Sequence, residues 1–269
     1  MSPESSCEQG REPDGGWDAL RERWLGAWPR AQAAWGTSTR LHAPVLHGPG
    51  GPPSDPAAGS FAWFSCTDVE VHVDLAHVVR LGLADHAESL LAHEVGHHVL
   101  APGDLSTAAR VLARVRRGLV DRDAAAPMVA NLWCDLLIND RLQRRAGLRL
   151  DAVWRALGPP PADDVVMLAV LRADELLWSL PSGSLTGADG PGRPDPAQQR
   201  EVPAPPPSSL GTATRRWWQR RPADPARPGP VPSQRPSAEP PRVVPEAEAQ
   251  LLARMVRVFA DDPVAGAGG

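Results

Sequence analysis

Hydrophobic residues recur at helical spacing over most of the chain. Trp17, Trp24 and Trp35, with the leucines and alanines between them, predict an amphipathic helix, or two helices separated near Pro29. We interpret this aromatic stripe as core packing rather than as a ligand platform, because tryptophan contributes mainly apolar area when buried. Further helices are predicted over residues 76–81, 85–100, 107–119 (capped by Ser106), 127–146, 151–157, 163–180 and 246–260.

Alternating polarity replaces helical spacing only between residues 61 and 75. Val69, Val71 and Val73 alternate with polar residues, which predicts a β-strand with one buried face and one polar face. Residues 43–60 are rich in proline, glycine and serine, so we expect a loop there. We expect the strand over 69–74 at the edge of a small antiparallel sheet, where it either binds an extended peptide or simply covers the core. The fold class is therefore α+β and mostly helical.

The composition of the chain changes near residue 181. Residues 1–14 are predicted to be a disordered lead, and residues 15–180 form one predicted domain. Residues 181–245 are rich in proline and arginine, a composition that cannot bury a core and that predicts a disordered linker. An isolated amphipathic helix is expected over 246–260, packing back or binding a partner. Deletion of residues 181–269 should then leave thermal unfolding of the body nearly unchanged.

Charge and targeting signals narrow the possible partners. The formal net charge is −4, which gives no bulk electrostatic argument for binding nucleic acid or an anionic membrane. The basic and aromatic cluster from Arg215 to Arg221 can contact nucleic acid or lipid, but such a patch more often docks on an acidic protein surface. We therefore expect no membrane partner and do not favour nucleic acid.

The cysteines and the hydropathy of the chain predict a cytoplasmic protein. Cys7, Cys66 and Cys134 lie far apart and form no CxxC pair, so a disulfide framework is not expected. The N-terminus has no apolar core of a secretory signal, and no apolar run is long enough to span a bilayer. A reducing compartment fits all of these features.

The segment from His93 to His97 reads His-Glu-x-x-His and carries the strongest chemical signal. Histidines four residues apart on a helix are separated by about 40° and about 6 Å, so both imidazoles can reach one metal ion. Glu94 lies beside them, where its carboxylate can act as a general base rather than as a ligand. Gly96 predicts that another backbone packs closely there. The alternative is a buried helix with hydrogen-bonded core histidines.

A polar stripe on the predicted helix over 127–146 offers a third ligand. Asn131, Asp135 and Asn139 are spaced four residues apart in an otherwise apolar helix. Asparagine is a mediocre helix former, so this stripe is best explained if it faces something polar and buried. We predict that Asp135 is the third protein ligand, oriented with the histidines by the two asparagines. A buried polar network without a metal is the competing interpretation. Weaker ligand candidates are Asp121, Asp140 and Glu175.

The two helices resemble a known family. The chain is similar to the bacterial zinc metallopeptidases of the zincin (HExxH) fold that are associated with von Willebrand factor A-like domains, over about residues 60–147. The resemblance implies a zinc-dependent peptidase-like domain that can work beside AAA-type ATPases. No von Willebrand-type domain follows here, so we expect such a partner to be a separate chain. The pair His97-His98 and Pro102 depart from the family pattern. The matching residues are His93, Glu94, His97, Asn131, Asp135, Ile138 and Asn139.

We therefore expect a zinc-dependent peptide-bond hydrolase. His93, His97 and Asp135 would hold Zn²⁺, and Glu94 would pass a proton from the attacking water to the leaving nitrogen. Because the chain has no tyrosine, the oxyanion must be stabilised by a histidine such as His72 or His98, by an arginine, or by the metal alone. The alternative is a non-catalytic zinc-containing scaffold that acts through its Pro/Arg-rich tail, which an intact general base disfavours.

Overall fold

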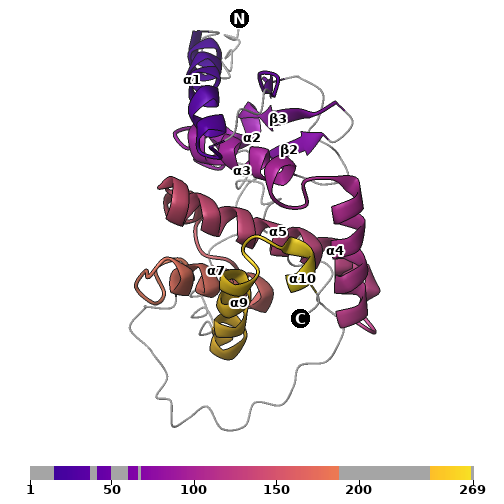
Figure 1. The fold of residues 1–269 in the computed structure, drawn as a ribbon. Helices are drawn as coiled ribbons and strands as arrows, with labels where there is room; N and C mark the ends of the chain where they lie inside the picture. The colour runs from indigo at the N-terminus through magenta and orange to yellow at the C-terminus, as the bar shows by residue number, and fades with distance from the viewer. Residues whose placement is uncertain (1–14, 37–40, 50–59, 66–67, 188–242, 268–269) are drawn as a thin grey trace, which may run out of the picture.

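The computed structural model describes residues 15–36, 41–49, 60–65, 68–187 and 243–267. Helices form most of it, with one small sheet at one end (Figure 1), as predicted for an α+β fold. None of the helices in these ranges has the length and apolarity needed to cross a membrane. The predictions for residues 1–14, for residues 188–242 of the linker with its Arg215–Arg221 cluster, and for Cys7 and Cys66 lie outside these ranges. In chain order the elements are α1 (Gly15–Ala33), β1 (Val45–His47), β2 (Ala62–Ser65), β3 (Glu70–Asp74), α2 (Leu75–Arg80), α3 (Ala87–Val99), α4 (Leu105–Gly118), η1 (Asp123–Ala125), α5 (Ala126–Arg141), η2 (Leu142–Ala146), α6 (Leu150–Leu157), α7 (Val165–Leu177), α9 (Glu246–Val258) and α10 (Pro263–Gly266).

Helix α1 is a single helix that continues through Pro29, which is the first of the two predicted alternatives. Its tryptophans keep one continuous buried face: Trp24 and Trp28 are buried, and the helix packs against α3. Just beyond its end, the Trp35 indole Nε1 donates a hydrogen bond to the carbonyl of Ala92 at 2.8 Å. The aromatic stripe therefore forms part of the core, as predicted.

The sheet has three strands in the order β1-β3-β2. Strand β3 pairs with β2 in antiparallel and with β1 in parallel orientation, so the sheet is mixed rather than antiparallel. Strand β3 is central, and the prediction of an edge strand over 69–74 is wrong. The prediction that residues 43–60 are all loop is also wrong, because β1 lies within them. A three-residue strand is held by its neighbour rather than by its own propensity, so the local sequence gives no signal for it.

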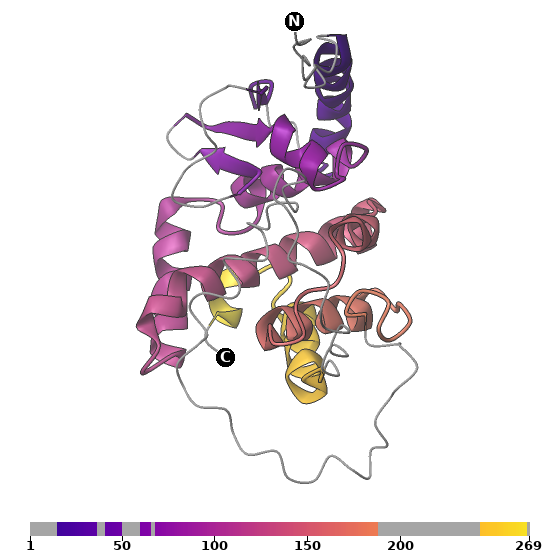
Figure 2. The same ribbon diagram turned by 180° about the vertical axis from the view of Figure 1, so that it is seen from behind.

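Helix α3 lies between the sheet and α5, as Figures 1 and 2 both show. At Gly96 the neighbouring side chains approach the helix closely. A Cβ atom there would lie 2.6 Å from Ile138 Cγ2 on α5 and 2.7 Å from Trp35 Cζ2. The predicted close packing at Gly96 is therefore present, although side chains make the approach instead of a backbone. This packing allows α3 and α5 to face each other across their polar stripes.

Helices α4 and α5 follow the predicted order with shifted ends. The Asp104 carboxylate caps α4 by accepting a hydrogen bond from the Thr107 backbone N–H at 2.7 Å, so the predicted Ser106 cap is wrong by two residues. Helix α5 continues into a π-helical turn, η2, and ends at Gly147, whose φ of 69° suits glycine. Helices α6 and α7 lie at the predicted places, and α7 packs against α5.

The folded body extends past residue 180. Glu175 is fully buried, and its carboxylate accepts hydrogen bonds from the backbone N–H groups of Gly183, Leu185 and Thr186 at 3.1, 2.7 and 3.1 Å. Arg172 Nη1 donates to the same carboxylate at 3.0 Å. A buried charge needs such donors, and here they come from residues 181–187. These residues therefore belong to the domain rather than to the linker.

The C-terminal segment, residues 243–267, packs onto the body instead of standing alone. Helix α9 lies along α7 and buries Ala249, Ala253 and Val256. Arg172 donates from Nε and Nη2 to the two carboxylate oxygens of Glu246 at 2.7 and 3.1 Å. Helix α10 then packs against α4 and α5. Of the two alternatives for the helix over 246–260, packing back onto the body is the one observed, and only its description as an isolated unit is corrected. Its small alanine side chains allow α7 to approach closely.

Candidate metal centre

Helices α3 and α5 bring the three predicted ligands together. His93 and His97 lie one turn apart on α3, and Asp135 faces them from α5. The Nε2 atoms of His93 and His97 lie 3.5 and 3.3 Å from Asp135 Oδ1. The three side chains are 17–18 % exposed, so the group is enclosed but still reachable by solvent. Among the described residues, this is the group of histidine, cysteine and acidic side chains that is close enough to bind a metal ion through three ligands.

Hydrogen bonds determine which nitrogen each histidine presents. His97 Nδ1 lies 3.0 Å from the backbone carbonyl oxygen of Ala101, and His93 Nδ1 lies 2.8 Å from the side-chain Oδ1 of Asn139. A carbonyl oxygen can only accept, so each Nδ1 carries the hydrogen and donates it. In a neutral imidazole Nε2 therefore presents a lone pair, and the Nε2 atoms of both histidines face Asp135. This arrangement of outer partners is typical of metal-binding histidines.

Asp135 is held by a neighbour on its own helix. Asn131 Nδ2 donates to Asp135 Oδ2 at 2.8 Å, while the other oxygen, Oδ1, is buried and has no hydrogen-bond partner. When both imidazoles are neutral, two lone pairs and a carboxylate oxygen face one another without a donor among them, an arrangement that a cation would stabilise, whether a metal ion or a proton on an imidazole. Ligand atoms around a tetrahedral Zn²⁺ are about 3.4 Å apart. The observed separations match this value, so the residues present fit a zinc ion.

The pKa values of His93 and Asp135 also indicate that the centre favours a positive charge. Burial lowers the pKa of His93, but the adjacent Asp135 carboxylate outweighs it and raises the pKa to about 9. Burial raises the pKa of Asp135, but the adjacent imidazoles of His93 and His97 outweigh it and lower the pKa to about 2. Both shifts mean that a positive charge between the imidazoles and the carboxylate is strongly favoured.

Glu94 lies next to both histidines on α3 and is buried. Burial raises the pKa of its carboxyl group, and the neighbouring charges of His93 and His97 only partly oppose that rise. A carboxyl group whose pKa is raised toward neutral pH can both accept and return a proton during a reaction. The position and environment of Glu94 therefore suit a general base.

The other ligand candidates lie in separate parts of the molecule. Asp140 forms an ion pair with Arg144, Glu175 holds the loop after α7, and Asp121 is exposed. His86 lies just before α3 and makes no capping hydrogen bond with its side chain. None of these residues joins the three-ligand group.

The two histidines considered as oxyanion stabilisers lie on opposite sides of the sheet. Val71 and Val73 of β3 are buried, so His72 between them lies on the outer face. His98 lies on the α3 side, where its ring stacks on Phe64 of β2 at 5.0 Å between centroids. Of the two, only His98 stays on the side of the sheet that carries the ligands.

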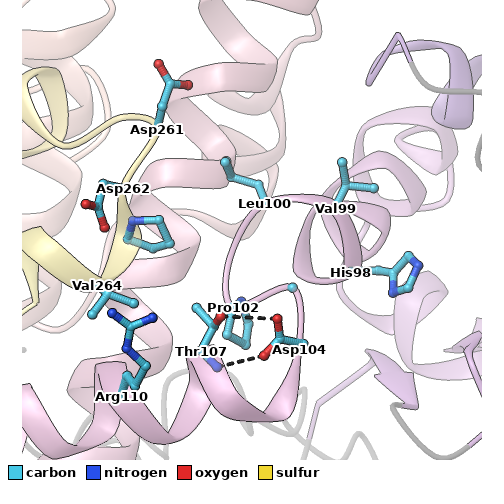
Figure 3. Close-up of a pocket in the computed structure, with 12 residues that line it drawn as sticks. His98, Val99, Leu100, Pro102, Asp104, Thr107, Arg110, Asp261, Asp262 and Val264 are labelled. Atoms are coloured by element: carbon cyan, nitrogen blue, oxygen red, sulfur yellow. Dashed lines mark hydrogen bonds between the residues drawn. The ribbon is translucent and has the colours of Figure 1, made fainter.

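A cavity of about 420 Å³ lies between the loop after α3 and the start of α10 (Figure 3). Pro102, Asp104 and Arg110 line it on one side, and Asp262 and Val264 on the other. No ligand of the metal centre lines this cavity, and Figure 3 shows the His98 ring directed away from it. The cavity is therefore separate from the candidate metal centre.

Sequence reasoning missed one member of the site, the carbonyl of Ala101. The available signal was Pro102, which prevents the chain from continuing as a helix and leaves the carbonyl of Ala101, just beyond α3, without a helical partner. His97 donates to this carbonyl. The two asparagines, by contrast, were assigned to orienting roles from their spacing, and both make the expected contacts.

Comparisons of the chain with protein-family models, with curated proteins and with solved structures found no match. The resemblance to zincin metallopeptidases, which depends on the motifs alone, therefore stays a prediction. What the site can do is argued below from its geometry.

Proposed function

We propose that the chain is a zinc-dependent peptide-bond hydrolase. The observation that carries the proposal is the buried Asp135 Oδ1 facing the lone pairs of His93 and His97, with Glu94 beside them. A zinc ion bound there would supply Lewis-acid chemistry, which lowers the pKa of water and polarises a carbonyl group. Structural zinc sites usually have four protein ligands, whereas three ligands leave a position open for reactants. The presence of an adjacent carboxylate also favours a hydrolytic site.

The residues of the site divide the work of hydrolysis. His93, His97 and Asp135 would hold the ion, and their partners Asn139, Ala101 and Asn131 keep the donor atoms pointed at it. Glu94 accepts a proton from the attacking water and gives it to the leaving amide nitrogen. The water oxygen ends in the new carboxylate, and the transferred proton ends on the new amine.

The proposed binding strand for the peptide differs from the one expected from the sequence. Strand β2 is an edge strand next to α3, and no described residue pairs with its outer side. An extended peptide that added to this edge would run beside the metal-binding helix. Strand β2 thus replaces the central strand β3 as the proposed peptide-binding strand, and His98 lies against it through Phe64.

Zinc content and peptide hydrolysis of the purified full chain test the proposal. His93→Ala and His97→Ala should each lose the tightly bound zinc ion of this site, whereas Glu94→Gln should keep it and lose hydrolysis, because the amide cannot accept the proton. The exposed His42 provides the matched control, and His42→Ala should change neither quantity. Full zinc occupancy in the His93→Ala protein would refute the site, and full activity in Glu94→Gln would refute the mechanism.

The role of Asp135 has its own test. Asp135→Asn keeps the shape of the side chain but removes the charge that offsets Zn²⁺, so zinc affinity should fall by orders of magnitude. Asn131→Ala and Asn139→Ala should weaken affinity by about 10- to 100-fold, since they remove only the groups that orient the ligands. If the folded Asp135→Asn protein binds zinc as the wild type does, Asp135 is not a ligand.

A further inference from the structure

The outer face of the sheet carries a second group of histidines, on the side opposite α3. Leu46, Val71 and Val73 are buried, so their neighbours His47 and His72 lie on the outer face. The parallel register sets His47 opposite Asp74 and Val45 opposite His72, which makes the two histidines diagonal neighbours on β1 and β3. This pairing could not be read from the sequence, because β1 itself was predicted as loop.

The two imidazoles face each other directly. His47 Nε2 lies 3.1 Å from His72 Nδ1, and the rings are inclined by only 10°. Trp63 of β2 lies opposite His72, and its indole is parallel to both rings, with interplanar angles of 2° and 8°. The tryptophan therefore forms one wall of the histidine pair and restricts how the rings can turn.

The remaining nitrogen of His72 has no partner. His72 Nε2 is buried without a hydrogen bond, and it lies 3.8 Å from Glu70 Oε2, just beyond hydrogen-bond distance. In the present pair, one of the two facing nitrogens must carry a hydrogen. If His72 carries its hydrogen on Nε2 instead, that hydrogen points to Glu70, and the facing nitrogens His47 Nε2 and His72 Nδ1 both present lone pairs. A carboxylate behind a metal-binding histidine is a common supporting arrangement.

We propose that His47 and His72 form a second site for a divalent transition-metal ion such as Zn²⁺ or Cu²⁺. Neighbouring nitrogen ligands lie about 3.4 Å apart on a tetrahedral Zn²⁺ ion and about 2.8 Å apart on a square-planar Cu²⁺ ion, and the 3.1 Å between the two facing nitrogens lies between these values. Imidazole nitrogens suit both Zn²⁺ and Cu²⁺, and of these two ions Cu²⁺ generally binds more tightly. Only two protein ligands meet here, so water completes the coordination, and the affinity is lower than that of the three-ligand centre.

Charged groups of both signs surround the histidine pair. Burial is the main cause that lowers the pKa of His47, followed by the charge of His72, with Arg21 acting in the same direction and Asp74 opposing them. Glu70 and Asp74 add negative charge on the same face of β3.

A zinc titration of the full chain by equilibrium dialysis tests the proposal. The wild type should bind about two zinc ions per chain, the second more weakly than the first. His47→Ala and His72→Ala should each lose the second ion and keep the first, and the retained first ion reports that the variant has folded. His42→Ala, which removes an exposed histidine of the same segment, should keep both. A second ion that persists in both His47→Ala and His72→Ala overturns the proposal.

Two further variants leave both imidazoles in place. Glu70→Gln should weaken the second ion by about tenfold or more, because it removes the carboxylate behind His72. Cu²⁺ bound at this site should quench the fluorescence of Trp63, so the quenching that accompanies the second binding step should shrink in Trp63→Phe. A histidine pair that is only structural predicts wild-type titrations for Glu70→Gln and no second quenching step, and that result would also overturn the proposal.

Discussion

The α3–α5 pair and the C-terminal segment over 243–267 are both amphipathic in sequence, yet their sequences determine different things. In α3 and α5 the informative residues are polar and four positions apart, so helix geometry alone gathers them on one face. In α9 the informative residues are small and apolar. They indicate that one face is buried but not what covers it. The partner turns out to be α7, where Arg172 lies 74 residues before Glu246.

The comparison separates chemistry from stability. The polar stripes of α3 and α5 contribute a site whose loss should remove a metal ion but leave the fold. The C-terminal segment contributes buried contacts whose loss should remove the fold but not change the ligand set. Each prediction below tests one side of this separation.

The largest effect is expected from Ala253→Glu on α9. Ala253 is 3 % exposed, so the substitution buries an unpaired charge against α7 and should destabilise the protein by more than about 4 kcal/mol. That corresponds to a melting temperature lower by about 10 °C or more in a domain of this size. Leu251→Glu, at an exposed position of the same helix, should change the melting temperature little. Equal melting temperatures for the two variants would show that α9 does not pack on the body in solution.

The next largest loss of stability is expected from Glu175→Gln, which should lower the free energy of unfolding by about 3 kcal/mol. The amide keeps the size of the side chain but loses the charge that accepts hydrogen bonds from Arg172 and from the loop over 181–187. Urea unfolding measures the loss, with the exposed Glu248→Gln as the control. Zinc affinity of the folded protein should be unchanged. A reduced zinc affinity at full stability would instead link Glu175 to the metal centre.

Gly96→Ala should destabilise the protein by about 1–3 kcal/mol and, unlike the first two changes, should also weaken metal binding. The added methyl group would meet Ile138 and Trp35 and push α5, with Asp135, away from α3. Gly26→Ala, on an open face of α1, should stabilise slightly, by about 0.5–1 kcal/mol. The double variant Gly96→Ala/Ile138→Ala should recover part of the lost zinc affinity. Failure of this rescue would mean that the clash does not move α5.

The smallest effect on stability is expected from Asp174→Asn. Unlike the destabilising changes above, it should stabilise the protein, and the gain should depend on pH. Burial, and secondarily the charge of Asp140, raises the pKa of Asp174 well above its ordinary value of 3.8. A carboxyl group whose pKa is higher in the folded protein than in the unfolded chain binds its proton more tightly when the protein is folded. The protein therefore loses stability as the pH rises above the pKa of this group in the unfolded chain. Asp174→Asn should therefore raise the melting temperature at pH 8, and the gain should vanish near pH 4. A gain independent of pH would show that Asp174 is not protonated on folding.

The sequence determined the helices and most of the site. The spacing His93-x-x-x-His97 and the stripe Asn131, Asp135 and Asn139 are local properties of two helices, so helix geometry predicted the ligands and their orienting partners. The structure places all of these residues as expected, because each helix can only present such residues on one face. Metal identity and catalysis stay predictions on the same motifs.

The features that depend on contacts between distant parts of the chain were decided only by the tertiary structure. Strand β1 exists only because β3 lies beside it, which made β3 central and brought His47 to His72. The loop over 181–187 is ordered by one buried carboxylate, and the C-terminal segment by a helix far away in the chain. A local pattern shows that a face is buried, but its partner is chosen by which surfaces fit together in space, and that fit is a property of the whole chain.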